Sequence, residues 1–406
     1  GIFKEGKKNE YDNNIGLKRY NLRSNIDFDA TKTTLVKVDI SGQYLQTNYP
    51  GTSTNTIFNS MCRTPSYLMP AEYSDGTIAG HPRPSGNRVN PYNLLMNSGY
   101  AREWRTSIQS KLEVDQKLDF ITKGLNWKGL ISFDADMKYI AKRTKTPTQY
   151  LATGRDENGG LQFKKVVEGS DVLTEKLENS SNKKIYFETS FNYNRTFAQK
   201  HDVTAMVLYM QKETQYHNNA LPYRKQGLVG RATYGYDGRY FIEGNFGYTG
   251  SENFEPGKQF GFFPSGAIGW VPTNYDFMRK AVPWLDFLKI RFSYGQVGND
   301  RISNKRFPYL TIINSNAATG WGSDSNGVNE SIVGADNLAW EKSTKADVGI
   351  EAKFFKEKLS LVVDYFNDQR NGIFQQRTQV PDFAGIITMP YGNVGKMRSY
   401  GADGNI

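Results

Sequence analysis

The chain has 406 residues, 14% of them aromatic and 39 of them glycine, and its single cysteine excludes an internal disulfide or a cluster of cysteine ligands. Lys and Arg exceed Asp and Glu by 10. Charges of both signs alternate along the chain, so no one-sign stripe follows nucleic-acid phosphates and we expect no nucleic-acid partner. No run of 18 apolar residues is present, which excludes a transmembrane helix.

Taken from the N-terminus, the chain repeats one pattern, in which apolar and polar side chains alternate. In residues 107–120 the even positions include Ile108, Leu112 and Val114, whereas the odd positions include Lys111 and Glu113. Similar alternation is found at residues 20–30, 36–44, 127–139, 185–193, 240–248, 288–294, 346–352 and 359–365. Many segments are about 12 to 18 residues long, longer than soluble strands of about 5 to 6 and long enough to cross a bilayer at a tilt. The pattern predicts strands with one face toward lipid.

The connections between these strands are of two lengths. Short connections are predicted at residues 31–33, 122–124, 198–200, 236–238 and 355–358, and a medium one at 274–284 with room for a short helix. Long polar connections are predicted at residues 50–102, 144–183, 216–226, 300–337 and 371–393, the second with a hairpin containing LQFKKVV. The two lengths alternate, with a short connection at 255–258 as the one departure. This asymmetry is typical of outer-membrane barrels.

Five tryptophans lie where predicted strands meet connections. They are Trp104, Trp127, Trp270, Trp284 and Trp340. Aromatic rings at both ends of an apolar band are typical of membrane-interface girdles, whereas packing in a soluble β core would place them in the middle of strands. We therefore expect an all-β fold, part of a transmembrane antiparallel up-and-down β-barrel. We count 12 strands and the start of a thirteenth, and expect residues 1–406 to belong to a single barrel domain.

The C-terminal half contains phrases that resemble the SusC/RagA family of TonB-dependent outer-membrane transporters. These are GFFPSGAIGW at 261–270, LKIRFSYGQVGN at 288–299, WEK at 340–342 and DYF at 364–366. The first 230 residues match more loosely. The resemblance implies a barrel of about 22 strands around a plug, in the outer membrane of a Gram-negative, Bacteroidetes-type cell.

The same resemblance implies active import of oligosaccharides or peptides, with energy from the TonB complex and a SusD-like lipoprotein over the outer mouth. The partners are then this lipoprotein, the TonB complex, outer-membrane lipid and the substrate. No segment resembles the plug or the N-terminal extension, so we expect an internal fragment of a larger transporter. Two alternatives stay open, which are a soluble β-rich carbohydrate-binding or adhesin module and a passive porin.

No sequence motif of catalysis is present, so we expect no enzyme, no cofactor and no metal centre. Asp134 and Asp136 share a face and are a candidate Ca²⁺ pair; the alternative is two solvated carboxylates balanced by Lys128 and Lys138. For substrate contacts we expect Trp321 and Tyr309 in the same long connection, because sugar rings stack on exposed aromatic faces.

The lipid-facing interpretation has a direct structural test. Leu112, Ile131 and Ile290 all belong to predicted apolar faces. If they packed in a protein core against a second sheet, the transporter hypothesis would be wrong.

Overall fold

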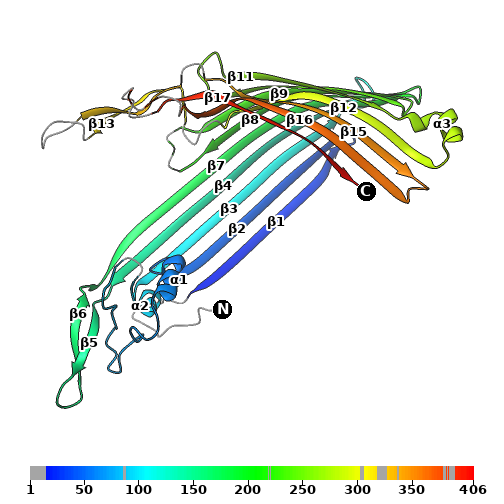
Figure 1. Ribbon diagram of the computed structural model, residues 1–406. Helices are drawn as coiled ribbons and strands as arrows, with labels where there is room; N and C mark the ends of the chain where they lie inside the picture. Colours follow the sequence, from blue (N-terminus) through cyan, green and yellow to red (C-terminus); the bar gives the residue numbers. More distant parts are fainter. Residues whose placement is uncertain are drawn as a thin grey trace.

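One 13-stranded antiparallel sheet dominates the computed structural model (Figure 1). The structure describes residues 15–85, 88–217, 219, 221–301, 306–317, 327–335, 338–377, 381, 383 and 389–406. The predicted antiparallel all-β fold and the predicted thirteen strands are confirmed within these residues.

Strands of the sheet pair in chain order. They are β1 (Gly16–Thr31), β2 (Thr34–Pro50), β3 (Gly99–Lys117), β4 (Leu125–Thr146), β7 (Ser170–Phe197), β8 (His201–Gln215), β9 (Tyr223–Tyr236), β10 (Tyr240–Ser251), β11 (Phe260–Trp270), β12 (Leu285–Asn299), β15 (Glu341–Phe354), β16 (Leu359–Gln376) and β17 (Tyr391–Asn405). Two hairpins stand outside it, β5 (Gln149–Arg155) with β6 (Leu161–Val167) and β13 (Ile312–Ala317) with β14 (Gly327–Ile332). The predicted LQFKKVV hairpin is therefore confirmed, whereas the β13–β14 hairpin was not predicted.

The two ends of the sheet differ, as the connection lengths predict. One end carries short turns, among them Asp237-Gly238, where both residues have positive φ as a tight hairpin requires. The helix α3 (Asp276–Ala281), which follows a 3₁₀ turn at Pro272–Asn274, fills the predicted medium connection at this end. The opposite end carries α1 (Thr54–Arg63), α2 (Pro91–Met96) and the β5–β6 hairpin (Figure 1).

Each strand of the sheet presents one apolar and one polar face. Register places Ile26, Val38, Leu112, Ile131 and Phe187 side by side across β1, β2, β3, β4 and β7. The three test residues are all exposed, Leu112 at 43%, Ile131 at 51% and Ile290 at 36%. Within the described residues no second sheet lies against this face. The core-packing outcome that would have refuted a lipid-facing sheet is therefore not observed.

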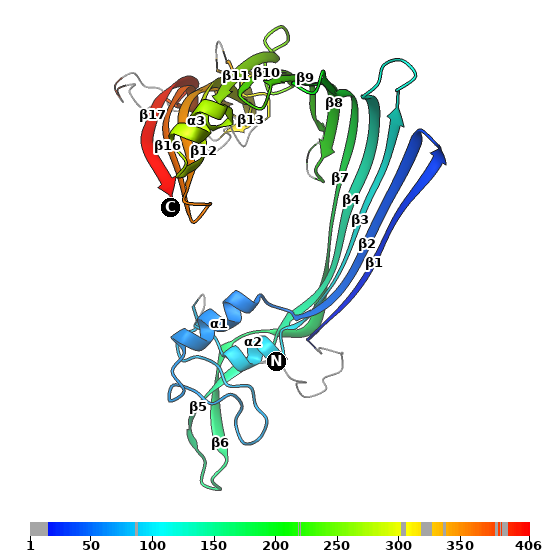
Figure 2. The same ribbon diagram turned by 90° about the vertical axis from the view of Figure 1, so that its right-hand side faces the viewer.

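The sheet is curved (Figure 2). The side chains on its polar face are the more crowded ones. The side chains of Glu113 and Asp115 are only 16% and 17% exposed, although they are charged. Side chains on the concave side of a curved sheet converge, whereas those on the convex side spread apart. The polar face therefore lines the inside of the curve and the apolar face lies outside.

Two strands are longer than the sequence predicts. β4 has 22 residues and β7 has 28, so much of the expected connection at 144–183 is strand. Lys142 pairs with Glu178 and Arg143 with Glu175 in this extension, one pair on each face of the sheet. Because both faces are charged there, alternation no longer marks the strand.

No helix in the described part of the chain is long and apolar enough to span a membrane.

Candidate functional site

The polar face of the sheet carries a ladder of ion pairs between neighbouring strands. Lys37 of β2 lies 3.0 Å from Glu113 of β3, and Asp39 of β2 lies 2.8 Å from Lys111 of β3. The pairs recur along the wall, and exposed pairs of this kind each contribute little to stability. Their main effect is to keep this face of the sheet polar and of mixed charge.

Asp134 and Asp136 each have a basic partner on this wall. Asp134 lies 3.4 Å from Lys184, and Asp136 lies 2.9 Å from Arg105. Lys128 and Lys138, expected to balance them, instead pair with Asp115 and Glu103. The sequence showed the face of each carboxylate but not its cross-strand register. Among the described residues no group of three or more His, Cys, Asp or Glu side chains is placed to hold a metal.

Arg291 of β12 is the centre of the densest charge group on the polar face. Its guanidinium lies 2.6 Å from Asp364, 3.1 Å from Glu351 and 3.4 Å from Asp347, a set we call the Arg291 cluster. Gly349 makes this possible, because a Cβ there would lie 2.2 Å from an Asp364 oxygen and 2.7 Å from Arg291 Nε. The cluster joins β12, β15 and β16 across the wall.

A hollow of about 680 Å³ lies near the short-turn end of the same face. Phe241 and Phe287 line it together with Lys289 and Arg291. Phe241 is 40% exposed and packs beside Gly235 and Gly269. Apolar rings on an otherwise charged wall were not predicted, since each falls at a polar-face position of its strand.

At the long-loop end, apolar side chains form a small core. Phe254, Ala335, Leu338 and Trp340, the rim cluster, are all buried. The Phe254 and Trp340 rings are stacked with centroids 4.8 Å apart, and Trp340 Nε1 donates to the Gln259 carbonyl at 3.2 Å. Trp340 does not lie on the apolar face as predicted. It is 8% exposed and packs against Phe263, whose ring is on the polar face.

Next to the rim cluster, Asp300 ties three strands together. Its carboxylate accepts hydrogen bonds from Lys225 of β9 at 2.7 Å and from Ser251 of β10 at 2.7 Å, directly after the end of β12. Asp300 is 8% exposed. Such buried, paired charges hold geometry rather than add stability. The loops that follow these strand ends therefore start from fixed positions.

Of the two expected substrate contacts, Tyr309 is described and Trp321 lies outside the described residues. Tyr309 is half-buried and packs against the rim cluster, with its ring 6.1 Å from that of Phe307. Tyr309 lies at the long-loop end, where its packing gives it a structural role. Its contact with substrate stays a prediction.

The other four predicted interface tryptophans lie on the apolar face or in a turn. Trp104 packs beside Tyr139 at 5.6 Å, Trp270 is 43% exposed, and Trp284 stacks on Phe354 at 5.9 Å. Trp127 donates to Thr189 at 2.8 Å.

Two of these tryptophans bracket an apolar band of membrane thickness. Trp127 pairs with Gln116, which is 12 positions beyond Trp104 on β3. Twelve residues at about 3.3 Å each span roughly 40 Å, or about 30 Å along the membrane normal at a tilt of about 40°. This matches the bilayer core of about 30 Å.

Comparison with known proteins agrees with this two-faced sheet. The family model "TonB dependent receptor-like, beta-barrel" matches residues 5–406. TonB-dependent receptor P3 of Formosa agariphila is 26% identical over 435 residues, covering 97% of this chain and 40% of the relative. TonB-dependent receptor SusC of Bacteroides thetaiotaomicron is 26% identical over 180 residues, covering 44% of this chain and 18% of the relative.

Solved structures give the same fold. The structure of the RagAB peptide transporter superposes with a TM-score of 0.68 at 19% identity, covering 97% of this chain and 44% of that one. The chain thus spans less than half the length of these relatives. The resemblance to SusC and RagA is confirmed, and the chain belongs to the TonB-dependent receptor-like β-barrel family.

Proposed function

We propose that this chain forms part of the wall of a transporter that imports oligosaccharides or peptides across the outer membrane, driven through the TonB complex. One observation carries the proposal, which is the sheet with an exposed apolar face and an ion-paired polar face. Such a sheet, closed into a barrel, satisfies its backbone groups in lipid and encloses water. Membership of the TonB-dependent receptor-like family makes energised uptake the natural use of that interior.

The proposed partner is a SusD-like lipoprotein at the outer mouth. Support comes from the relative named SusC and from the similar solved structure, whose title names a RagAB peptide transporter. In this chain, the rim cluster and Asp300 would hold the outer loops in place beneath such a lid. Tyr309 and Trp321 are the proposed aromatic contacts for substrate among those loops.

We also propose that Trp104, Trp127, Trp270 and Trp284 anchor the wall at the membrane interfaces. The support is the placement of Trp104 and Trp127 at the two ends of an apolar band about 30 Å high, the thickness of a bilayer core, together with the exposed positions of Trp270 and Trp284. Amphipathic rings favour this level because one edge is apolar and the ring nitrogen can bond to water or headgroups.

The test uses the full-length parent transporter in cells with and without an intact TonB complex. Labelled oligosaccharides and oligopeptides are offered, and uptake is measured in both strains. We expect uptake of one class that falls to background when the TonB complex is deleted. Uptake that is unchanged by the deletion would favour a passive porin, and recovery of the parent in the soluble fraction would favour a soluble β-rich module.

A further inference from the structure

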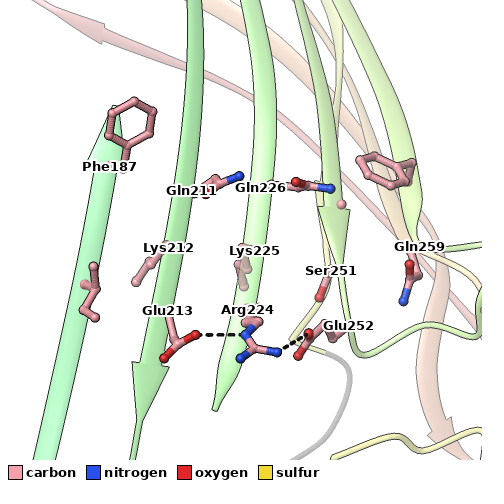
Figure 3. A pocket seen from close by; sticks show the side chains of 13 residues that line it. Phe187, Gln211, Lys212, Glu213, Arg224, Lys225, Gln226, Ser251, Glu252 and Gln259 are labelled. Carbon is pink, nitrogen blue, oxygen red and sulfur yellow. Dashed lines mark hydrogen bonds and ion pairs between the residues drawn. The ribbon is translucent and has the colours of Figure 1, made fainter. Parts of the chain in front are cut away.

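A polar notch interrupts the apolar face near the long-loop ends of β8, β9, β10 and β11, beside the middle of β7 (Figure 3). The notch is a cavity of about 440 Å³. Register puts it on the apolar face, since Ile131, Phe187, Gln211, Gln226 and Phe260 are linked by direct cross-strand pairing through Gly250. We call this cavity the outer notch.

The outer notch lies where this face changes from apolar to polar. Along β8 the face carries Val207 and Tyr209 and then Gln211 and Glu213, toward the long-loop end. The apolar side of the cavity is lined by Phe187 and Phe260, and the polar side by Glu213, Arg224 and Glu252, with Ile185 directly opposite Glu213. A bilayer changes in the same direction at its headgroup level. An amphipathic molecule is therefore matched along the whole length of the cavity.

The cavity depends on a glycine. A Cβ on Gly250 would lie 2.6 Å from the Phe260 ring, so a larger side chain there would enter the space. The glycine lies between the amide of Gln226 and the aromatic ring, at the level where the two kinds of lining meet.

The polar side presents both signs of charge close together. Arg224 lies 2.9 Å from Glu213 and 3.8 Å from Glu252, so one guanidinium is shared by two carboxylates (Figure 3). Arg306 also reaches Glu252 at 3.2 Å, but its guanidinium stacks on Tyr223 and is 13% exposed. The groups offered to a ligand are thus two carboxylates and one Arg224 side chain that is 59% exposed.

This pattern distinguishes among lipid headgroups. Lys212 and Lys225 also line the cavity, but they alternate with Gln211 and Gln226 along β8 and β9, so their side chains belong to the opposite face, where Lys225 pairs with Asp300. On the face of the outer notch, a purely anionic headgroup would therefore meet two carboxylates around Arg224. A headgroup with an ammonium next to a phosphate can donate to Glu213 or Glu252 and accept from Arg224 at once, through charge-assisted hydrogen bonds. A trimethylated ammonium carries no N–H and cannot donate.

We propose that the outer notch is a binding site for an outer-leaflet lipid with a phosphoethanolamine headgroup, its acyl chain lying along Phe187 and Phe260. The proposal rests on the outer-membrane location given under the proposed function. The headgroup can belong to a phospholipid or to a phosphoethanolamine-bearing glycolipid, which share this chemistry.

The experiment is native mass spectrometry of the full-length parent in detergent with equimolar phosphatidylethanolamine, phosphatidylcholine and phosphatidylglycerol. We expect phosphatidylethanolamine to be retained over both others. The double variant Glu213→Gln with Glu252→Gln should lower its retention about tenfold, the effect of one charge-assisted hydrogen bond. Gly250→Leu should lower retention of all three lipids, because it fills the cavity.

Glu255→Gln is the matched control, because Glu255 is an exposed rim carboxylate that pairs with Lys258 outside the outer notch. It should retain lipid as the parent does. Heat-modifiable electrophoretic mobility shows that each variant has a folded barrel. Equal retention of the three lipids by the parent, or equal behaviour of the double variant and the control, would overturn the proposal.

A second arm identifies the natural source. Lipid extracted with the parent from its own outer membrane should contain a phosphoethanolamine headgroup, on a phospholipid or on a glycolipid. A protein is the alternative occupant of the outer notch. To test for it, Gly250→Cys is made in a Cys62→Ser background and treated with a thiol reagent in whole membranes. If a protein protects this cysteine and lipid alone does not, the lipid assignment is wrong. A parent that imports substrate but retains no phosphatidylethanolamine refutes only this inference, whereas a parent absent from the outer membrane refutes the proposed function as well.

Discussion

A charge placed on the apolar face should lower the folding stability far more than the same charge placed nearby on the polar face of the same strand. Leu112 lies between Trp104 and Gln116 on β3, and Gln116 pairs with Trp127 at the other end of the apolar band. The midpoint of this band is residue 110, so Leu112 is about 7 Å from it along the strand, or about 5 Å along the membrane normal. Leu112→Arg therefore puts a guanidinium close to the bilayer midplane.

The expected cost of Leu112→Arg is about 2 to 4 kcal/mol, the range for Arg or Lys on the lipid face near the midplane. This corresponds to a folding equilibrium lowered by about 30-fold to 1000-fold. Gln109→Arg is the matched control, since residue 109 lies on the polar face opposite Asp134. We expect the control to change stability by less than about 0.5 kcal/mol, as for ordinary surface substitutions.

The assay is urea unfolding of the full-length parent and both variants in lipid vesicles, followed by electrophoretic mobility without heating. The difference between the two variants measures the environment of each face directly. Equal costs for the two variants, or a larger cost for Gln109→Arg, would refute the assignment of lipid to the apolar face.

Three further outcomes follow from the geometry. Gly349→Val should lower stability by about 1 to 3 kcal/mol, because its side chain would break the Arg291 cluster. Gly247→Val is the control and should leave stability unchanged, because a Cβ at Gly247 meets nothing within 4 Å. Urea unfolding midpoints compare the two variants, and equal midpoints would show that steric clash with the cluster does not lower stability. Trp340→Ala should loosen the rim cluster at a cost of about 3 to 5 kcal/mol, seen as faster proteolysis of the outer loops with the wall intact; unchanged cleavage would contradict this. The Thr77 amide donates to the Asp75 carboxylate at 2.9 Å and lowers the pKa of that carboxyl below the ordinary 3.8. This turn is therefore stabilised above about pH 4 and should loosen as pH falls through the lowered pKa. Hydrogen exchange of the Thr77 amide, corrected for intrinsic rates, measures this; exchange that does not change with pH in that range, or that Asp75→Asn leaves unaffected, would contradict the prediction.

The wall strands could be predicted from the sequence because each face meets a different solvent. Where lipid lies on one side and water on the other, as around Leu112 and Glu113, period-two alternation is enforced residue by residue. The turn positions followed from the same signal, since alternation stops there and residues such as Asp237 and Gly238 favour tight hairpins.

Other features depend on register or on surroundings that no local pattern records. The outer half of β7 was expected as a loop because water reaches both of its faces. Trp340 was placed in a girdle by its position next to β15, although loop residues such as Phe254 bury it. The ion-pair partners of Asp134 and the outer notch required cross-strand pairing between segments far apart in the sequence.

The strand order has a consequence for how the wall is built. Every strand of the large sheet pairs with its neighbour in the chain, because β5–β6 and β13–β14 fold back on themselves and leave the order undisturbed. Contact order is therefore low for a sheet of this width, and each added hairpin closes only one loop. Assembly can proceed as a zipper, hairpin after hairpin, with each new strand templated by the one made just before it.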